Sequence, residues 1–249
     1  SAKHLNFRYK GREVLKDAHV NLGFGEILGI IGPNGAGKSS LIKLLAGVEP
    51  LQSGEIFYQS QPISALTLNA LAQQRAYVPQ KQDIQWPISV HHAVSLGRLP
   101  HTGAWQNLAV NDVRHIERAM QIMELQGIAT RSINELSVGE QARVAMARAM
   151  ATNAKILLCD EPVAALDVTH QQALMIALRS QADQGVAIAV VLHDLNLARR
   201  YCDRVALLEQ GVIVACGSSS EVLVPNLLNN IYKVEFDEIL AKQGYLQPR

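Results

Sequence analysis

Residues 32–39 of this chain read GPNGAGKS, directly after the apolar run ILGII at residues 27–31. A glycine, four further residues and then Gly-Lys-Ser make the P-loop pattern. Its glycines let successive backbone N–H groups point at a chain of phosphates without clashes from Cβ atoms. Residues 39–46 predict a helix that Gly47 ends, and the positive N-terminal end of that helix faces the same phosphates. The stretch therefore predicts a strand, a phosphate-binding loop and a helix.

Two side chains of the loop have specific roles in such a site. The Lys38 ammonium is expected to reach the β- and γ-phosphates, and the Ser39 hydroxyl to contact Mg²⁺. We expect the loop to bind a nucleoside triphosphate through Gly32, Asn34, Gly35, Ala36, Gly37, Lys38, Ser39 and Ser40.

A second motif, ILLCDEP, occupies residues 156–162. In P-loop enzymes an apolar strand that ends in aspartate holds Mg²⁺ directly or through water, and this is the role predicted for Asp160. Glu161 is then expected near the γ-phosphate, where a carboxylate can orient or deprotonate the attacking water. The alternative is a core strand that ends at a solvated acidic turn. The P-loop upstream favours the nucleotide interpretation.

Composition and charge limit the classes of protein to consider. The chain has 48% hydrophobic and 18% charged residues, as in ordinary globular proteins, and its net charge of +1 gives no indication of nucleic-acid binding. The three cysteines have no paired spacing, which favours a reducing compartment without a disulfide framework. No apolar run reaches the roughly 18 residues of a membrane-spanning helix. We therefore expect any link to a membrane to pass through a partner.

The hydrophobic pattern predicts one α/β domain in several parts. Leu5 and Phe7 alternate with polar residues, as in an antiparallel sheet. Later runs such as residues 186–192 are apolar throughout, which predicts mostly parallel strands buried on both faces. The middle of the chain instead shows helical spacing, clearest at 112–123 and 140–151. We expect residues 1–249 to form a nucleotide-binding core at 1–80 and 152–220, a helical subdomain at 81–151 and a C-terminal extension at 221–249.

Residues 136–141, LSVGEQ, resemble the signature motif of ATP-binding-cassette (ABC) ATPases, commonly Leu-Ser-Gly-Gly-Gln or -Glu. Ser137 followed three residues later by Glu140 is also a capping box, so a helix with a free, positive N-terminus is expected to begin there. The resemblance covers nearly the whole chain. Further residues match the family's motifs in the family's order: Tyr9 the adenine-stacking aromatic, Gln80 the Q-loop glutamine, residues 165–167 the D-loop and His193 the switch histidine.

The resemblance implies a P-loop ABC ATPase fold, with a mostly parallel sheet, an antiparallel β-subdomain and a helical insertion. It also implies ATP hydrolysis by a head-to-tail homodimer, in which each ATP with its Mg²⁺ lies between one P-loop and the partner's signature. The family's pattern assigns catalysis to Glu161, His193 and Gln80, further ATP contacts to Tyr9, Ser137, Gly139, Glu140 and Asp167, and Mg²⁺ contacts to Ser39, Gln80 and Asp160.

One residue departs from the signature, because Val138 stands at the first of the motif's two glycines. Valine fits right-handed helical dihedral angles at a small cost in helix propensity. The hydroxyl of Ser137 and the backbone amide of Gly139 stay available for phosphate, so we expect an active site.

A cassette without fused membrane helices is similar to the ATPase subunits of bacterial importers. Residues 89–101, SVHHAVSLGRLPH, and 193–203, HDLNLARRYCD, resemble the iron-siderophore, haem and cobalamin (type II) group. The resemblance implies a polytopic membrane permease, a periplasmic or surface substrate-binding protein, and a place at the cytoplasmic face of the plasma membrane. We expect a docking surface for the permease at residues 81–101, with Trp86, Ile88, Leu96 and Arg98 among its contacts.

Two alternatives stay open: a non-transport ABC switch that regulates a soluble partner, and an importer ATPase for free metal ions. A phosphotransferase is disfavoured, because the signature and the switch histidine would have no role in it. Histidines such as His4 and His19 have no supporting pattern in the sequence.

Overall fold

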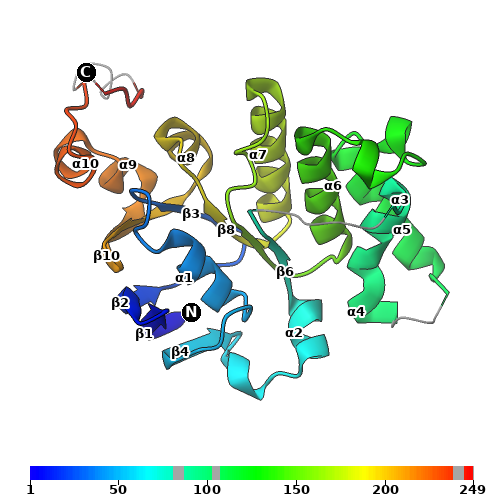
Figure 1. Cartoon of the computed structure of the whole chain (residues 1–249), viewed down its shortest axis with the longest axis horizontal. Coiled ribbons are helices and arrows are strands. Elements are labelled where there is room, and N and C mark those ends of the chain that lie inside the picture. Colours follow the sequence, from blue (N-terminus) through cyan, green and yellow to red (C-terminus); the bar gives the residue numbers. More distant parts are fainter. Residues whose placement is uncertain (81–86, 103–106, 238–243, 249) are drawn as a thin grey trace.

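Two β-sheets and a group of helices make up the computed structural model, which describes residues 1–80, 87–102, 107–237 and 244–248. The larger sheet runs through the middle of the molecule, with the smaller sheet and helix α1 (Lys38–Leu45) on one face and helices α7 (Val168–Asp183) and α8 (Leu195–Tyr201) on the other (Figure 1). Within the described ranges, none of the helices combines the length and apolarity needed to cross a membrane.

The larger sheet has the strand order β10-β9-β3-β8-β7-β6. The pairs β9–β3, β3–β8, β8–β7 and β7–β6 are parallel, and only the edge strand β10 is antiparallel to its neighbour. This confirms the mostly parallel sheet that the apolar runs predict. The strands are β3 (Ile27–Ile31), β6 (Arg75–Val78), β7 (Ile156–Cys159), β8 (Ala187–Val191), β9 (Arg204–Glu209) and β10 (Val212–Ser218).

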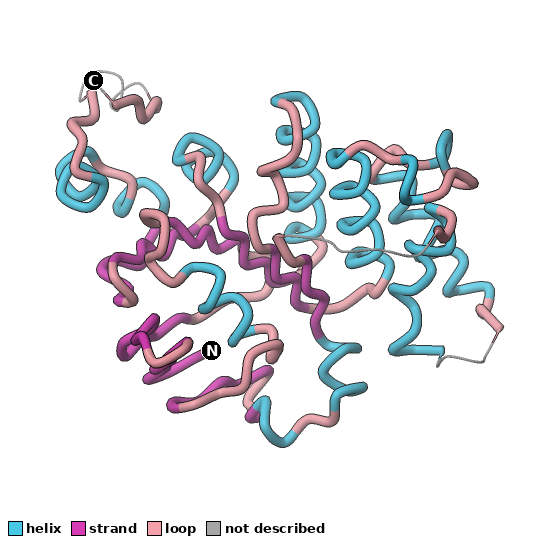
Figure 2. Tube along the Cα trace, in the orientation of Figure 1, coloured by secondary structure: helices cyan, strands magenta, loops and turns pink. Residues whose placement is uncertain are grey.

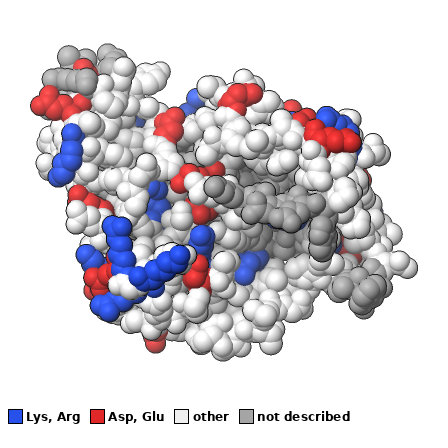
Figure 3. All heavy atoms as spheres, viewed as in Figure 1, with Lys and Arg blue, Asp and Glu red and all other residues white. Residues whose placement is uncertain are grey.

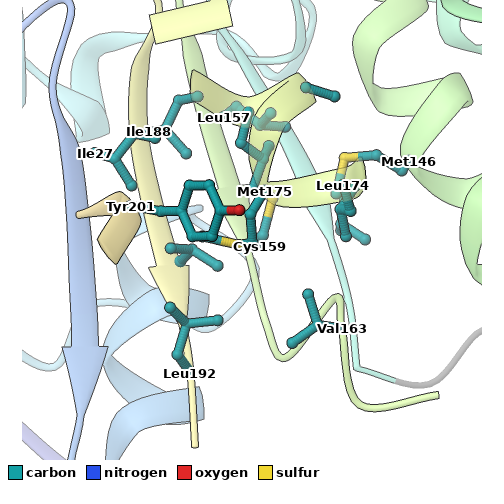
Figure 4. Packing of buried hydrophobic residues seen from close by; sticks show 14 of the residues in the cluster. Ile27, Met146, Leu157, Cys159, Val163, Leu174, Met175, Ile188, Leu192 and Tyr201 are labelled. Atoms are coloured by element: carbon teal, nitrogen blue, oxygen red, sulfur yellow. The ribbon is translucent and has the colours of Figure 1, made fainter. Parts of the chain in front are cut away.

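Both faces of this sheet are buried, and successive residues of a strand enter different cores. In β3, Ile27 and Ile31 pack with α7 and α8, whereas Leu28 and Ile30 pack with α1 and the smaller sheet. Figure 4 shows the first of these cores, where Ile27 and Ile188 lie near Tyr201 and Met175. A continuously apolar strand is therefore required, because a polar residue at any of these positions would be buried without a partner.

The smaller sheet is antiparallel, with the strand order β2-β1-β4-β5. Its inward residues, such as Leu5, Phe7 and Leu15, cover α1, which confirms the alternation seen in the sequence. The pairing of β1 with β2 contains register shifts. The strands are β1 (Ala2–Tyr9), β2 (Arg12–Val20), β4 (Ser53–Tyr58) and β5 (Gln61–Pro62).

The helices between residues 90 and 151 stand together at one end of the larger sheet (Figure 2). Helical spacing predicts two of them well, since α5 and α6 lie within two residues of the expected ranges at every boundary. Their buried residues, such as Ile116 and Met146, belong to the same core as the sheet residues Ile27 and Ile188. The helices are α3 (Val90–Ser95), α4 (Leu99–Thr102), α5 (Val110–Ile122) and α6 (Val138–Ala151) in this group, and α2 (Leu68–Gln74), α9 (Ser219–Val222) and α10 (Pro225–Tyr232) elsewhere.

Arg98 is not a surface residue, so its expected place in the docking surface is wrong. The residue is 5% exposed, its Nε donates to Asp112 Oδ1 at 2.8 Å, and its Nη1 donates to the Ala151 and Thr152 carbonyls at 2.9 Å. A Cβ on the preceding Gly97 would lie 2.2 Å from the Arg148 carbonyl oxygen. The pair Gly97-Arg98 therefore ties α3 to the C-terminal end of α6, and a charge so buried is held by its partners.

Candidate nucleotide-binding site

The P-loop needs glycine at several of its positions. Gly32, Gly35 and Gly37 have φ angles of 147°, 78° and 107°, which other residues rarely adopt. A Cβ on Gly32 would lie 2.1 Å from the Leu208 carbonyl oxygen, and a Cβ on Gly37 would lie 2.8 Å from that of Val14. The glycines of the motif are thus required by the backbone path and by close packing against β9 and β2.

Lys38 is buried at the first position of α1, and its ammonium group faces the loop. Its Nζ donates to the carbonyl oxygens of Gly32 at 2.8 Å and Pro33 at 3.0 Å. Burial lowers the pKa of Lys38 from its usual value, while the negative charges of Glu161 and Asp160 act in the opposite direction. A cation in this position can neutralise phosphate charge at the mouth of the loop.

Ser39 and Asp160 form a pair of hard oxygen ligands beside the loop. The Ser39 hydroxyl donates to Asp160 Oδ1 at 3.0 Å, and Asp160 is 1% exposed at the end of β7. Burial raises the pKa of Asp160 above its ordinary value, and the hydrogen bond from Ser39 offsets only part of this rise. Mg²⁺ prefers oxygen ligands, and beside phosphates it is usually held by only one or two protein groups. A buried carboxylate with a hydroxyl next to it fits both preferences.

The three residues predicted to be catalytic meet at one carboxylate group. Glu161 Oε2 accepts a hydrogen bond from Gln80 Nε2 at 2.6 Å, and Glu161 Oε1 lies 2.6 Å from His193 Nε2. The backbone of Glu161 is left-handed, with a φ of 52°, which a residue other than glycine keeps only where its surroundings hold it. Gln80, Glu161 and His193 follow β6, β7 and β8, which are neighbours in the sheet, so their carboxyl ends lie at one edge.

A cavity of about 820 Å³ lies in front of the P-loop. Residues 33–40 line it together with Glu161 and with Tyr9, whose ring is exposed and has the Lys10 Nζ 5.7 Å from its centroid. This places Tyr9 where an adenine base could stack on it, and that role stays a prediction.

Several cavity residues were not predicted from the sequence. Arg12 and Lys16 come from β2, and Lys233 comes from the end of α10, whose Tyr232 has a hydrogen bond with the Gly32 backbone. Basic side chains gather on this part of the surface, over β2 and α1 (Figure 3). Arg12 and Lys16 are an even number of residues apart, as residues on one face of a strand are, and this weak signal could be read from the sequence. Nothing local could connect Lys233 with a loop two hundred residues earlier.

The signature residues lie away from this cavity. Ser137 Oγ accepts from the Glu140 N–H at 3.3 Å, and Glu140 Oε2 accepts from the Ser137 N–H at 2.8 Å, so the predicted capping box at the start of α6 is confirmed. Asp167 caps α7 in the same way, accepting from the His170 N–H at 2.9 Å. None of these residues lines the P-loop cavity of the same chain. The start of α6 is therefore a helix N-terminus separate from the P-loop, and its contact with phosphate stays a prediction.

Comparison with known proteins identifies the family. The family model described as "ABC transporter" matches residues 15–164, which is 150 residues and more than half of the chain. The chain belongs to the ABC transporter family. As an ABC ATPase it binds and hydrolyses ATP, and the resemblance that its motifs show is confirmed.

Curated relatives place this ABC ATPase near one group of importers. It is 42% identical over 236 residues to the hemin import ATP-binding protein HmuV of Thermobifida fusca, covering 95% of this chain and 82% of the relative. It is 39% identical to the protein of the same name from Pseudomonas entomophila strain L48, covering 93% and 91%.

Solved structures show the same fold. An inward-facing ABC transporter assigned to the metal-chelate type is 25% identical, with a TM-score of 0.80 over 94% of this chain and 89% of the other. A dimeric ATP-binding cassette in a post-hydrolysis state, bound to ADP and phosphate, is 26% identical, with a TM-score of 0.77 over 88% and 97%.

We expect Val138→Gly to change the ATPase rate little and Gly139→Asp to abolish it. Val138 is the first residue of α6 and 69% exposed, so we do not expect its side chain to distort the neighbouring groups predicted to contact phosphate. A Cβ added to Gly139 would make an ordinary contact, 3.4 Å from the Ala165 carbonyl oxygen, so the expected loss comes from the negative charge that an aspartate would bring toward phosphate. Steady-state phosphate release by the assembled transporter measures both.

The change in ATPase rate of Val138→Gly should be much smaller than the roughly 100-fold change caused by losing one hydrogen-bond donor to a developing charge. A rise of that size in Val138→Gly would instead show that valine holds the native enzyme at a reduced rate.

Proposed function

We propose that this chain is the ATP-hydrolysing subunit of a bacterial importer. The imported substrate is a metal chelate: haem, an iron-siderophore or cobalamin. The observation that carries the proposal is the identity of about 40% with hemin import ATP-binding proteins over nearly the whole chain. The division of residues 1–249 into a core, a helical subdomain at 81–151 and a C-terminal extension belongs to the same proposal.

A homodimer supplies what one chain lacks. The P-loop cavity and the capped start of α6 are separate in the monomer, and each is a site for anionic oxygen. In a head-to-tail dimer, ATP held by the P-loop of one chain meets Ser137 and Gly139 of the other. Closure then depends on the γ-phosphate, because only a triphosphate reaches both groups of donors.

Hydrolysis follows from the residues around Glu161. The Glu161 carboxylate accepts a proton from the attacking water as the oxygen bonds to the γ-phosphorus and the bond to ADP breaks. Gln80 and His193 each contact one of its oxygens and hold it in place. Lys38 and the P-loop amides balance the charge of the phosphates. Ser39 and Asp160 would hold Mg²⁺, with Gln80 as a further contact in our proposal, and a bound ion would add positive charge at the β- and γ-phosphates.

Transport requires a membrane partner, and we propose that a polytopic permease contacts residues 81–101, with a substrate-binding protein on the other side. This places the chain at the cytoplasmic face of the plasma membrane. In the described part of this segment, Ile88 and Leu96 are half-buried and Leu99 is exposed. Residues 81–86, including Trp86, lie outside the described residues.

We expect Leu99→Glu to reduce ATP-driven haem uptake in proteoliposomes without lowering ATP binding by the free subunit, because a charge at an apolar contact opposes docking. Val214→Glu on β10 is the matched control, since Val214 is 42% exposed and Leu99 is 43% exposed. Co-purification with the permease is measured in parallel.

The same preparation separates the alternatives. Uptake of free metal ions instead of chelates would favour a free-metal importer. ATP-dependent capture of a soluble protein, with no permease bound, would favour the switch.

A further inference from the structure

Three exposed side chains converge on the outer face of the smaller sheet, outside the nucleotide site. His4 comes from β1, and Asp17 and His19 come from β2. His4 Nδ1 lies 2.8 Å from Asp17 Oδ1, and His19 Nε2 lies 3.2 Å from the same oxygen. One ligand atom from each residue lies within 4.8 Å of the other two. Two imidazole nitrogens therefore point at one carboxylate oxygen.

The backbone is bent so that this convergence occurs. His4 and Asp17 both have left-handed backbones, with φ angles of 52° and 48°, and the pairing of β1 with β2 shifts register beside them. The Asn6 side chain accepts from the Asp17 N–H at 2.9 Å and donates to the His4 carbonyl at 3.1 Å. A Cβ on Gly54 of β4 would lie 2.4 Å from the His4 carbonyl oxygen. The distorted strands are thus held by neighbours on both sides.

We propose that His4, Asp17 and His19 bind a divalent first-row transition metal ion such as Zn²⁺. Two imidazoles and one carboxylate suit Zn²⁺, Cu²⁺ or Ni²⁺, whereas Mg²⁺ and Ca²⁺ prefer oxygen ligands alone. Three protein ligands leave a coordination position open to water or another ligand, as in zinc sites that are not purely structural. This site is separate from Ser39 and Asp160.

Both imidazoles bind the metal in their neutral form, so no proton has to be released from them. His4 binds through Nδ1 with its proton on Nε2, and His19 binds through Nε2 with its proton on Nδ1. His19 then gives up the long contact of 3.4 Å in which Nδ1 accepts from the His4 N–H. The Asp17 carboxylate is exposed and is ionised at neutral pH, as aspartate ordinarily is. No redox step or further reactant is needed.

A bound metal would link β1 to β2 near the start of the sheet, whereas Tyr9 and Arg12 pair at the other end of the same two strands. Because the ion binds only the folded arrangement, it raises the melting temperature, and the rise grows with the logarithm of the free ion concentration once that exceeds the Kd. ATP hydrolysis by the free subunit is not expected to depend on it.

The test is calorimetric titration of Zn²⁺ into untagged, chelator-treated protein without nucleotide, in a Cys216→Ser background because that thiol is exposed. One Zn²⁺ per chain is expected to bind, and Co²⁺ to give the absorption of a low-coordinate site. His4→Asn and Asp17→Asn are the decisive variants, because asparagine tolerates the left-handed backbone. Each is expected to weaken binding at least tenfold, since loss of an outer partner alone costs about 10- to 100-fold.

The matched control is His91→Ala, which removes an imidazole that lies 3.6 Å from the single carboxylate of Glu117. It is expected to bind Zn²⁺ like the parent. The proposal is overturned if the parent binds no Zn²⁺, if His4→Asn binds as tightly as the parent, or if His91→Ala weakens binding equally. Circular dichroism and ATP hydrolysis are measured for each variant as well. A variant that loses Zn²⁺ binding but keeps both is folded and active, so failure of the metal site is distinguished from failure of the proposed ATPase function.

Discussion

Glu161→Gln is expected to bind MgATP while losing at least about 100-fold in hydrolysis, the low end of what a positioned general base contributes. An amide oxygen cannot take the proton of the attacking water, whereas the P-loop, Lys38 and the Ser39–Asp160 pair stay unchanged. The variant should therefore close around ATP and stay closed. Phosphate release measures the first effect, and size-exclusion chromatography with ATP shows whether a dimer accumulates.

Glu117→Gln is the control, because this carboxylate on α5 is exposed and pairs only with His91 among the interactions described. It should hydrolyse ATP and elute like the native chain. Turnover of Glu161→Gln at the native rate would remove the general-base role and leave Glu161 as a residue that positions Gln80 and His193.

Lys38→Ala is expected to fail one step earlier, at nucleotide binding. Hydrogen bonds to a charged group contribute roughly 1.5–3 kcal/mol each, so loss of two phosphate contacts predicts an ATP affinity lower by about 100-fold or more. The substitution also leaves the Gly32 and Pro33 carbonyls without the ammonium that they now accept from. Equilibrium titration with a fluorescent ATP analogue measures the change.

Lys43→Ala provides the comparison, because Lys43 belongs to the same helix but does not line the P-loop cavity. Its affinity for the analogue should stay within a few fold of the native value. Tight nucleotide binding by Lys38→Ala would contradict the role of the loop, since the cation would then contribute nothing to phosphate recognition.

The catalytic group shows why part of this site could be predicted from the sequence. Gln80, Glu161 and His193 are far apart in the chain, but each follows an apolar run. Parallel strands place such residues at one edge, and the structure brings the three side chains within hydrogen-bonding distance. Their meeting at one carboxylate was not predicted, because it depends on the strand order β8-β7-β6 and on the left-handed backbone of Glu161.

Two features could not be predicted from the sequence: the burial of Arg98, and the convergence of His4, Asp17 and His19. A charged residue within an apolar segment is usually exposed, yet Arg98 is buried against Asp112 and the end of α6. His4, Asp17 and His19 showed no pattern, because register shifts in β1 and β2 place them together. A shift of one residue changes the face on which a side chain lies, and local sequence does not reveal it.

The sequence by itself determined the P-loop, the helix cap at Ser137, the doubly buried strands and the family. These features depend on backbone preferences and spacing within a few residues, which the chain carries locally. Only the tertiary structure decided which charges are buried and that Lys233 reaches the P-loop cavity. These features depend on contacts between distant segments, whose geometry is set by strand order and packing.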